Sequence, residues 1–215
     1  MYFEKQRAAL CAVHAINNLL QRHVFTESDF AEIAAGLSAT ESQLGASEPV
    51  SYHVSLSGDF SIEVINKALE FFGIQLINLK SSEPTAVSIR NNPTSAEAFV
   101  LNRNTADSGH WLSIRSVNGQ FIELDSLKPT PVPISHTLLE LTIDQYLREG
   151  YTVFVCNSPL PSDHDLAAFE SNPPDSSDTE YMTSEEEQQH EQQQRMVEQE
   201  RADFAVAMAR SMMEK

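Results

Sequence analysis

Two residue types that together perform nucleophilic catalysis stand far apart in this sequence, a cysteine at position 11 and a histidine at position 110. Cys11 begins the amphipathic run Cys-Ala-Val-His-Ala-Ile-Asn-Asn-Leu-Leu, which predicts a helix with the thiol at its start. A thiol there lies near the positive end of the helix dipole, and a protonated His110 close by would lower its pKa further. The pair therefore predicts a thiolate nucleophile with a histidine as its base.

Asp125 is the candidate third member, because the sequence places it beside His110 in a hairpin. The dipeptide Asn118-Gly119 is a strong signal for a two-residue turn. Such a turn makes Leu112 face Asp125, so that His110 becomes the diagonal neighbour of Asp125, about 7–8 Å away on the same face. Asp125 can then accept a hydrogen bond from one imidazole nitrogen while the other takes the thiol proton. A shift of one residue in register would put the two side chains on opposite faces.

Gln6 lies five residues before Cys11, where its amide could donate a hydrogen bond to the oxyanion of a tetrahedral intermediate. Each of these residues also has an ordinary structural explanation when taken alone. Cys11 could be a small apolar residue of a buried helix face. His110 could end a strand beside Trp111, and Asp125 could cap the loop that follows it. Their joint presence favours a cysteine hydrolase, because nucleophile, base, orienting acid and oxyanion donor all have a candidate.

A metal site is the alternative use of Cys11 and His14, which are three residues apart on the expected helix. A structural zinc site needs four ligands, and Cys156, His23 and His53 show no paired spacing that would supply the other two. Cys156 ends an apolar run that predicts a strand, so core packing is the expected role of this second thiol. Neither a metal nor another cofactor is expected.

The elements that must position these residues are helices first and strands afterwards. Helices are expected over 9–21, 28–36, 62–72 and 138–148, and strands over 74–79, 98–102, 110–117, 120–125 and 151–156. Thr26 or Ser28 is the expected cap of the second helix, and Ser61 and Gly73 are expected to begin and close the third. Residues 37–58 are rich in Ser, Gly and Glu and predict a mobile excursion or a short helical arm. This order predicts an α+β fold rather than a parallel sheet.

Acidic residues exceed basic ones, above all in the last quarter of the chain. The net charge is −17 over 215 residues. Residues 1–156 contain 17 acidic and 10 basic side chains, and residues 157–215 contain 14 acidic and 4 basic ones. Such a surface repels nucleic acid phosphate and anionic lipid, so neither nucleic acid nor a membrane is an expected partner. A protein with a basic face is.

The cysteine count and the apolar runs indicate the compartment. Two cysteines cannot form a disulfide framework, and Glu4, His14 and Asn17 interrupt the apolar stretch that a secretory signal would need. No run approaches the roughly 20 apolar residues of a membrane span. With 41% hydrophobic residues the chain can build one core plus a tail. We expect a soluble, monomeric protein of the nucleus and cytoplasm, where a reduced thiol can be catalytic.

Several motifs in the first 157 residues resemble, in order, those of the Josephin domain. They are Glu4-Lys5-Gln6, Leu10-Cys11-Ala12 with His14, Asn17-Asn18-Leu19-Leu20-Gln21, Phe60-Ser61-Ile62 with Val64-Ile65, Ala68-Leu69 and Gly73, His110-Trp111, and Leu124-Asp125-Ser126-Leu127. The family consists of ubiquitin-specific cysteine proteases. The resemblance implies an α+β, papain-like cysteine protease fold over residues 1–157, with a helical subdomain and an antiparallel sheet.

The resemblance also implies a role for each candidate residue. Cys11 corresponds to the nucleophile, His110 to the general base and acid, Asp125 to the orienting third member and Gln6 to the oxyanion donor. The chain departs from the family at Asp125, because the type of member it most resembles carries asparagine there. An aspartate is compatible with the role and should stabilise the imidazolium more strongly.

The ubiquitin-contacting surfaces of the family correspond to Ile62 and Phe72 near the active site, and to Val24, Phe25 and again Phe72 on the opposite face. Val24 stands where the family has an aromatic residue, and Phe72 where it has a tryptophan. The helical arm that gates the family's cleft corresponds to residues 37–58, which are short and unlike it in sequence.

The sequence after the domain divides into three segments. Residues 158–183 are rich in Pro, Ser and Asp and predict a disordered linker, and residues 184–197 form a Glu/Gln-rich segment. Residues 198–215 regain helical spacing. The side chains at this spacing are Phe204, Ala207, Met208 and Ser211. Acidic residues before small Ala and Ser resemble a ubiquitin-interacting motif, and the alternative is a helix that self-associates or packs on the domain.

The resemblance therefore implies a deubiquitinase that hydrolyses ubiquitin isopeptide bonds without a cofactor, in polyubiquitin chains above all. Its expected partners are ubiquitin, polyubiquitin chains and ubiquitinated proteins. Two alternatives remain. One is a ubiquitin-binding adaptor with weak catalysis, against which the joint presence of the four catalytic candidates argues. The other is a different papain-like acyl transferase, which would not need the C-terminal motif.

Overall fold

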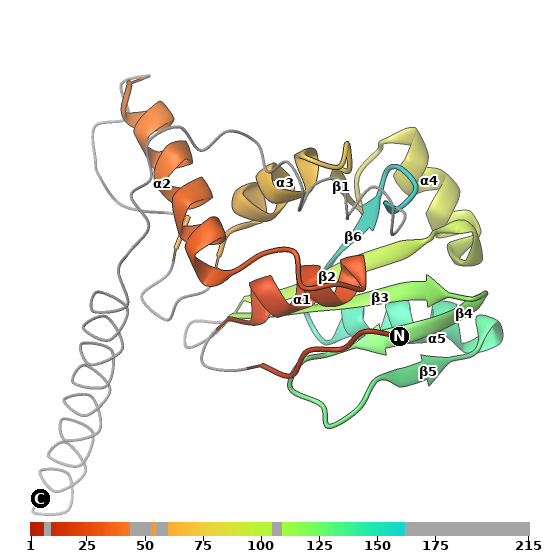
Figure 1. Cartoon of the computed structure of the whole chain (residues 1–215). Helices are drawn as coiled ribbons and strands as arrows, with labels where there is room; N and C mark the ends of the chain where they lie inside the picture. The colour runs from red at the N-terminus through yellow and green to blue at the C-terminus, as the bar shows by residue number, and fades with distance from the viewer. Residues whose placement is uncertain (7–9, 44–52, 55–59, 105–108, 162–215) are drawn as a thin grey trace, which may run out of the picture. The chain divides into compact units, whose positions relative to one another are not determined.

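The computed structural model describes residues 1–6, 10–43, 53–54, 60–104 and 109–161. Helices dominate the first half of this part and strands the second, as the sequence predicts (Figure 1). The helices are α1 Cys11–Leu20, α2 Glu27–Gln43, α3 Ile62–Glu70, α4 Pro84–Asn91, a 3₁₀ turn η1 Pro93–Ser95 and α5 His136–Arg148. The strands are β1 Leu76–Asn78, β2 Ala98–Asn104, β3 Gly109–Val117, β4 Gln120–Leu124, β5 Val132–Ile134 and β6 Thr152–Cys156. They form one antiparallel sheet in the order β1-β6-β2-β3-β4-β5, which is the expected α+β architecture.

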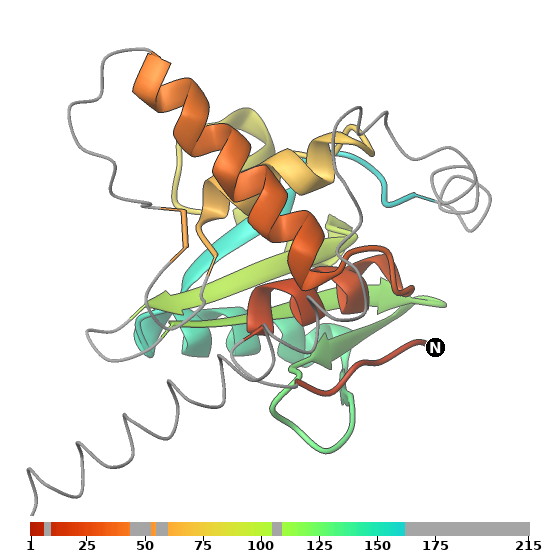
Figure 2. The same ribbon diagram turned by 60° about the vertical axis from the view of Figure 1, so that its left-hand side comes forward.

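The sheet separates two hydrophobic cores. On one face α1 packs against the strands, and α2 and α3 complete that core; α5 covers the other face (Figure 2). Ile89 of α4 belongs to the core on the α5 side. Alternate residues of β2 serve the two cores, since Ala98 and Val100 belong to the first and Phe99 and Leu101 to the second. Because both faces are covered, the first four residues of β2 are apolar and buried, and the middle of β3 is buried as well.

Helix α1 is buried on nearly all sides, with His14 as its one residue of intermediate exposure. Two of its buried residues are polar, Asn17 and Asn18, both 0% exposed. Asn17 accepts hydrogen bonds from the N–H groups of Val24 and Phe25 at 3.0 and 2.9 Å and donates to the Phe25 carbonyl at 2.8 Å. Its amide therefore stabilises the connection from α1 to α2, because these backbone groups would otherwise lack partners.

The hairpin between β3 and β4 has the predicted turn. Asn118 and Gly119 both have positive φ, 50° and 79°, as the two central residues of a type I′ turn require. Ser113 pairs with Leu124 in the resulting register. Continuing that register by one residue on each strand places Asp125 opposite Leu112, which confirms the predicted alignment.

Helix α2 is longer than the sequence analysis predicts. Thr26, one of the two expected caps, begins it: the Thr26 hydroxyl donates to Asp29 Oδ2 at 2.7 Å, and the Asp29 N–H donates back to Thr26 Oγ1 at 3.3 Å. The helix then continues through residues 37–43, the first part of the expected excursion. Ser38 and Thr40 donate their hydroxyl protons to carbonyls four residues earlier, which lets hydroxyl-rich sequence stay helical. The rest of the 37–58 segment lies outside the described residues, apart from His53 and Val54.

Three further details differ from expectation. The α3 helix begins after Ser61, but the Ser61 hydroxyl bonds to His53 Nδ1 at 3.1 Å instead of capping the helix. The sequence analysis did not identify α4 or β5, and both contain proline. Pro84 stands in the first turn of α4, where its missing N–H costs no helical hydrogen bond. Pro133 lies in β5, an edge strand, where a proline can be tolerated.

The described part of the chain extends slightly beyond β6. The Asn157 N–H donates to the Gln75 carbonyl at 3.0 Å, and the Leu160 N–H donates to Glu97 Oε2 at 2.9 Å. The first residues of the expected linker are therefore attached to the domain, whereas the rest of the linker, the Glu/Gln-rich segment and the C-terminal helix lie outside the described residues. Within the described ranges, no helix combines the length and the apolar character that crossing a membrane requires.

Candidate active site

The hairpin brings His110 and Asp125 together at its end away from the turn. His110 is the second residue of β3, and Asp125 directly follows β4. His110 Nε2 and Asp125 Oδ1 are 2.9 Å apart, and the two side chains are 16% and 11% exposed. The juxtaposition predicted from the two-residue turn is therefore confirmed. A neutral imidazole whose Nε2 donates to a carboxylate presents Nδ1 as an acceptor, which is the tautomer that a general base needs.

The local hydrogen bonds keep Asp125 ionised. Burial alone would raise the pKa of Asp125. The hydrogen bond from His110, the hydrogen bond from the Leu127 N–H to Oδ1 at 3.0 Å and the positive charge of Lys128 outweigh this effect and hold the pKa below its usual range. Asp125 is consequently a carboxylate at neutral pH and can fix both the orientation and the tautomer of the imidazole.

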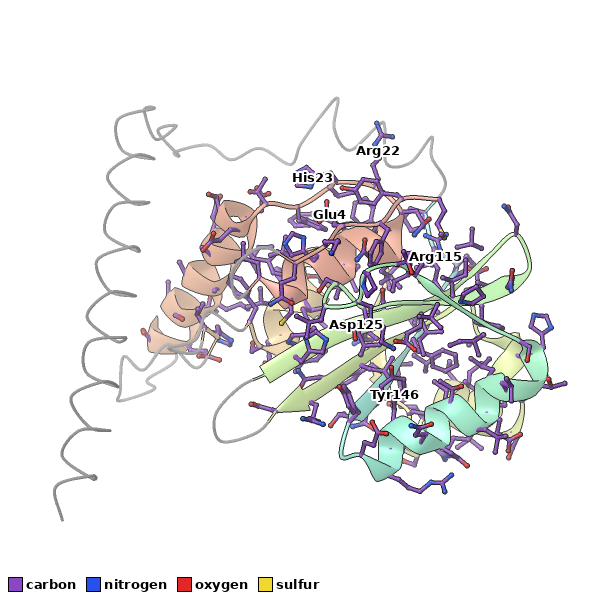
Figure 3. The ribbon with its side chains drawn as sticks, turned by 90° about the horizontal axis from the view of Figure 1, so that it is seen from below. Glu4, Arg22, His23, Arg115, Asp125 and Tyr146 are labelled. Carbon is purple, nitrogen blue, oxygen red and sulfur yellow. The ribbon has the colours of Figure 1, made fainter. Side chains whose placement is uncertain are left out.

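Glu123, near the end of β4, has one partner in the loop after Asp125 and one on α5. Glu123, two residues before Asp125, is 5% exposed. Lys128 forms an ion pair with Glu123, and the Tyr146 hydroxyl of α5 also bonds to it. Burial and the nearby carboxylates raise the pKa of Tyr146, so its phenol stays a donor. Figure 3 shows Tyr146 on the α5 side of the strands that lead to Asp125.

Gln6 is attached to the residue after Asp125. Its backbone N–H donates to the Ser126 carbonyl at 3.0 Å, and its side-chain Oε1 accepts from Ser126 Oγ at 3.2 Å. Ser126 itself is 2% exposed. Because the amide oxygen is engaged by a hydroxyl, the nitrogen end of the Gln6 amide is the end that can donate to a third group.

Cys11 is the first residue of α1 and is 1% exposed. The preceding residue, Leu10, makes no side-chain capping bond, and the first turn contains no acidic residue. The first N–H groups of a helix lack intrahelical acceptors, so partial positive charge accumulates around a thiol at this position.

Contacts between α1 and β3 place Cys11 at the His110 end of the sheet. Arg115 of β3 donates from Nη1 to the carbonyl of Leu19 in the last turn of α1. The two elements are packed together and run in the same direction (Figures 1 and 2). From Leu19 back to Cys11 the helix rises about 12 Å. From Arg115 back to His110 the strand spans roughly 16–17 Å. The structure thus gathers Cys11, Gln6, His110 and Asp125 at one end of the sheet.

The second thiol has a different environment. Cys156 ends β6 and packs into the core on the α1 face, as predicted. Burial raises its pKa to about 12, with a further increase from Glu97 and an opposing effect from Arg115. Such a thiol is protonated at neutral pH and chemically inert.

The residues considered for zinc have other partners. His14 Nδ1 lies 2.6 Å from Glu4 Oε2, and His53 Nε2 lies 3.2 Å from Glu41 Oε2. Within the part of the chain that the structure describes, no three His, Cys, Asp or Glu side chains are grouped so as to hold a metal ion.

The four candidate ubiquitin-contacting residues of the domain differ in exposure. Phe25 is 2% exposed, and its ring packs edge-on against Phe72 with the centroids 6.2 Å apart. Val24, Ile62 and Phe72 are half-buried on the same core. Val24, Ile62 and Phe72 are therefore partly accessible to a partner, whereas Phe25 is not. The corresponding candidates of the tail, Phe204, Ala207, Met208 and Ser211, lie outside the described residues.

The sequence analysis missed two residues that support the site, Ser126 and Glu4. Ser126 holds Gln6, and Glu4 is the hydrogen-bonding partner of His14 and His23. A usable signal was present, because two adjacent asparagines on an otherwise apolar helix must find hydrogen-bonding partners when the helix is buried. One of those partners is the backbone of Glu4.

Comparisons with known proteins agree with the geometry. The family model described as Josephin matches residues 6–157. The chain is 37% identical over 165 residues to a protein named Ataxin-3 homolog from Caenorhabditis elegans, covering 75% of this chain and 50% of that protein. It is 35% identical over 176 residues to an Ataxin-3 homolog from Arabidopsis thaliana, covering 76% and 61%. It is 35% identical over 173 residues to Ataxin-3 from Homo sapiens, covering 75% and 46%. The chain spans about half the length of these curated relatives.

Proposed function

Because the chain belongs to the Josephin family, we propose that it is a deubiquitinase, a thiol-dependent hydrolase of the isopeptide bonds that join ubiquitin to lysine side chains. The observation that carries this proposal is the His110–Asp125 hydrogen bond at 2.9 Å, at the end of the sheet where α1 begins with Cys11. We also propose that the chain acts in the ubiquitin pathway, with ubiquitin, polyubiquitin chains and ubiquitinated proteins as its partners.

The acylation half of the reaction uses three of the gathered residues. His110 takes the thiol proton through Nδ1, and the Cys11 thiolate adds to the carbonyl carbon of the isopeptide bond. The negative oxygen of the tetrahedral intermediate accepts a hydrogen bond from the Gln6 amide nitrogen and from backbone N–H at the start of α1. His110 then protonates the lysine nitrogen, the C–N bond breaks, and ubiquitin remains attached to Cys11 as a thioester.

The deacylation half repeats the same steps with water. His110 removes a proton from water, whose oxygen adds to the thioester carbon, and the C–S bond breaks to regenerate the thiol. Ubiquitin leaves with a free C-terminal carboxylate. Asp125 stays ionised throughout, because its pKa is lowered by its donors, and it stabilises the imidazolium that forms twice per cycle.

The proposal is tested by hydrolysis of a ubiquitin C-terminal amide that releases a fluorescent amine. We expect turnover by the parent chain, no turnover by Cys11→Ala and parental turnover by Cys156→Ala. A parent chain that binds ubiquitin without hydrolysing the amide would instead indicate a ubiquitin-binding adaptor.

We include in this proposal a second ubiquitin contact in the C-terminal segment, residues 198–215. The basis is the helical spacing of Phe204, Ala207, Met208 and Ser211 after acidic residues. A helix this short is marginal in water, so binding should be coupled to folding and weak. Connecting it to the domain by a flexible spacer raises the local concentration of a second ubiquitin, which should favour chains over single ubiquitin.

The tail proposal is tested by titrating ¹⁵N-labelled ubiquitin with a peptide of residues 196–215. We expect ubiquitin chemical shifts to move with the parent peptide and to stay in place with Ala207→Arg or Ser211→Arg. Equal shifts with the arginine peptides, or none with the parent peptide, would make this segment an ordinary packing helix.

A further inference from the structure

The carboxylate of Glu4 is the centre of a hydrogen-bonded cluster outside the four catalytic candidates. It lies 2.6 Å from His14 Nδ1 and 2.7 Å from His23 Nδ1, and it also accepts from the Tyr2 hydroxyl. The Asn17 amide nitrogen is 3.3 Å from both of its oxygens. Figure 3 shows Glu4 beside His23 over α1. The Glu4 side chain is 13% exposed, and this many hydrogen-bonding partners fix the position of its carboxylate.

The backbone of Glu4 is fastened to α1 as well. Its N–H donates to Asn18 Oδ1 at 2.6 Å, and its carbonyl accepts from Asn18 Nδ2 at 3.1 Å. Tyr2 makes a similar pair of bonds with Gln21, its N–H donating at 3.0 Å and its carbonyl accepting at 3.1 Å. The segment from Tyr2 to Glu4 is therefore held along α1 by side chains of the helix and of Gln21, the residue that ends it.

Glu4 is ionised in this position. Burial would raise its pKa, but the hydrogen bonds from His14, Tyr2, His23 and Asn17 lower it to about 2. A charged carboxylate makes stronger hydrogen bonds than a neutral amide does. The full strength of the cluster therefore depends on the negative charge of Glu4.

Two residues further along the chain the same segment reaches the other half of the site. The Gln6 N–H donates to the Ser126 carbonyl, and Gln6 Oε1 accepts from Ser126 Oγ. Ser126 follows Asp125 directly. The segment of residues 2–6 thus connects α1, which begins with Cys11, to the hairpin that carries His110 and Asp125.

We propose that Glu4 is a positioning residue, whose attachment to α1 sets where the Gln6 amide lies relative to Cys11; this inference rests on the proposed function. Two residues span at most about 7 Å, so fixing Glu4 leaves Gln6 little freedom. An oxyanion donor must lie about 2.7–3.1 Å from the developing negative charge. Displacement by about 1 Å can cost on the order of 10²-fold in rate. The partners of the Glu4 carboxylate are Tyr2, His14, Asn17 and His23, none of which is a catalytic candidate.

The test compares Glu4→Gln with Glu97→Gln. Glu97 is the matched control, because its carboxylate also fastens a chain segment, at Leu160, but belongs to the environment of Cys156. We expect Glu4→Gln to lower kcat on the ubiquitin amide by roughly 10-fold, since a partly misplaced donor loses part of its effect, with KM changed less than about 2-fold. Glu97→Gln should leave both constants at parental values. Alkylation of Cys11 by iodoacetamide, which needs no oxyanion donor, should proceed at the parental rate in Glu4→Gln.

A double variant separates positioning from general loss of structure. In a Gln6→Ala background, Glu4→Gln should lower kcat by less than about 2-fold, because the donor it positions is already absent. A loss as large as in the parent background would overturn the proposal. So would slower alkylation of Cys11 in Glu4→Gln, which would mean that the mutation disturbs α1 and the nucleophile instead.

Hydrogen exchange measures the positioning without any turnover. The Gln6 N–H, which donates to the Ser126 carbonyl, should exchange faster in Glu4→Gln and in Glu4→Ala than in the parent chain. In Glu97→Gln it should exchange at the parental rate. Unchanged exchange in both Glu4 variants contradicts the proposal. If the parent chain hydrolyses no ubiquitin amide, the proposed function fails by itself, and the exchange rates still decide whether Glu4 positions Gln6.

Discussion

The surroundings of Cys11 and of Cys156 differ in charge although both thiols are buried. Cys156 lies in an apolar core with Glu97 nearby, and its pKa rises to about 12. Cys11 lies at a helix start without acidic residues in the first turn, at the sheet end that holds His110. The two thiols therefore differ in their electrostatic surroundings and not in their exposure. Partial positive charge at a helix start favours a thiolate, whereas an apolar core with a carboxylate nearby disfavours one.

Removing His110 should make Cys11 resemble Cys156. His110→Ala deletes both the acceptor of the thiol proton and the positive charge that stabilises the thiolate. General acid–base catalysis contributes about 10²–10⁴-fold, so kcat/KM on the ubiquitin amide should fall by at least about 10²-fold. The measurement is steady-state hydrolysis, with His136→Ala, a histidine at the start of α5 whose Nε2 bonds to the Gly119 carbonyl, as the matched control. Near-parental turnover by His110→Ala would contradict the comparison.

Changing Asp125 should have a smaller effect that depends on the replacement. Asp125→Ala removes the acceptor of the His110 Nε2 proton and should lower kcat by roughly 10-fold or more, because the imidazole loses its fixed tautomer. Asp125→Asn retains an oxygen acceptor and should keep much of the activity. The check is kcat for both variants, and equal losses for alanine and asparagine would mean that Asp125 does not act by holding His110.

Acid should destabilise the fold by protonating two carboxylates, Glu4 and Asp125. Burial alone would raise the pKa of both Glu4 and Asp125. Their hydrogen bonds outweigh this effect and hold both pKa values below the usual range, at about 2 for Glu4. A folded-state pKa below the unfolded one stabilises the fold above the unfolded pKa of about 4, and this stabilisation is lost as the pH falls toward 2. The Tm should therefore drop between pH 6 and pH 3 by less in Glu4→Gln than in the parent chain. A matched control is Glu70→Gln, whose carboxylate is exposed and pairs with Lys67. Equal drops of Tm in Glu4→Gln and the parent would mean that the Glu4 carboxylate does not stabilise the fold.

The sequence predicts those features that depend on local rules. The Asn118-Gly119 turn sets the register, and the register alone brings His110 to Asp125. The length of α2 was underestimated, since hydroxyl side chains that favour loops can also bond to the preceding helical turn. The β5 strand was missed because Pro133 is unfavourable in a strand unless that strand lies at the edge of the sheet, which only the complete topology reveals.

Within the site, the residues identified from the sequence are those whose side-chain types suit nucleophilic catalysis. Gln6 and Cys11 stand out by type and spacing, whereas Glu4 and Ser126 act through tertiary contacts that span up to 120 residues. Helix α1 and the hairpin meet through the shared core and through long-range bonds such as the one from Arg115 to the Leu19 carbonyl, a contact with no signature in either local sequence. Local patterns thus predict the parts of the site, and long-range contacts decide how the parts meet.

The central claim is that Cys11, and not Cys156, is the nucleophile that attacks the ubiquitin C-terminus. It is tested most directly by incubating the parent chain with ubiquitin carrying a C-terminal electrophile, and mapping the modified residue by peptide mass spectrometry. The account predicts a single adduct on Cys11 that disappears in Cys11→Ala and persists in Cys156→Ala. An adduct on Cys156, or continued labelling of Cys11→Ala, would contradict it.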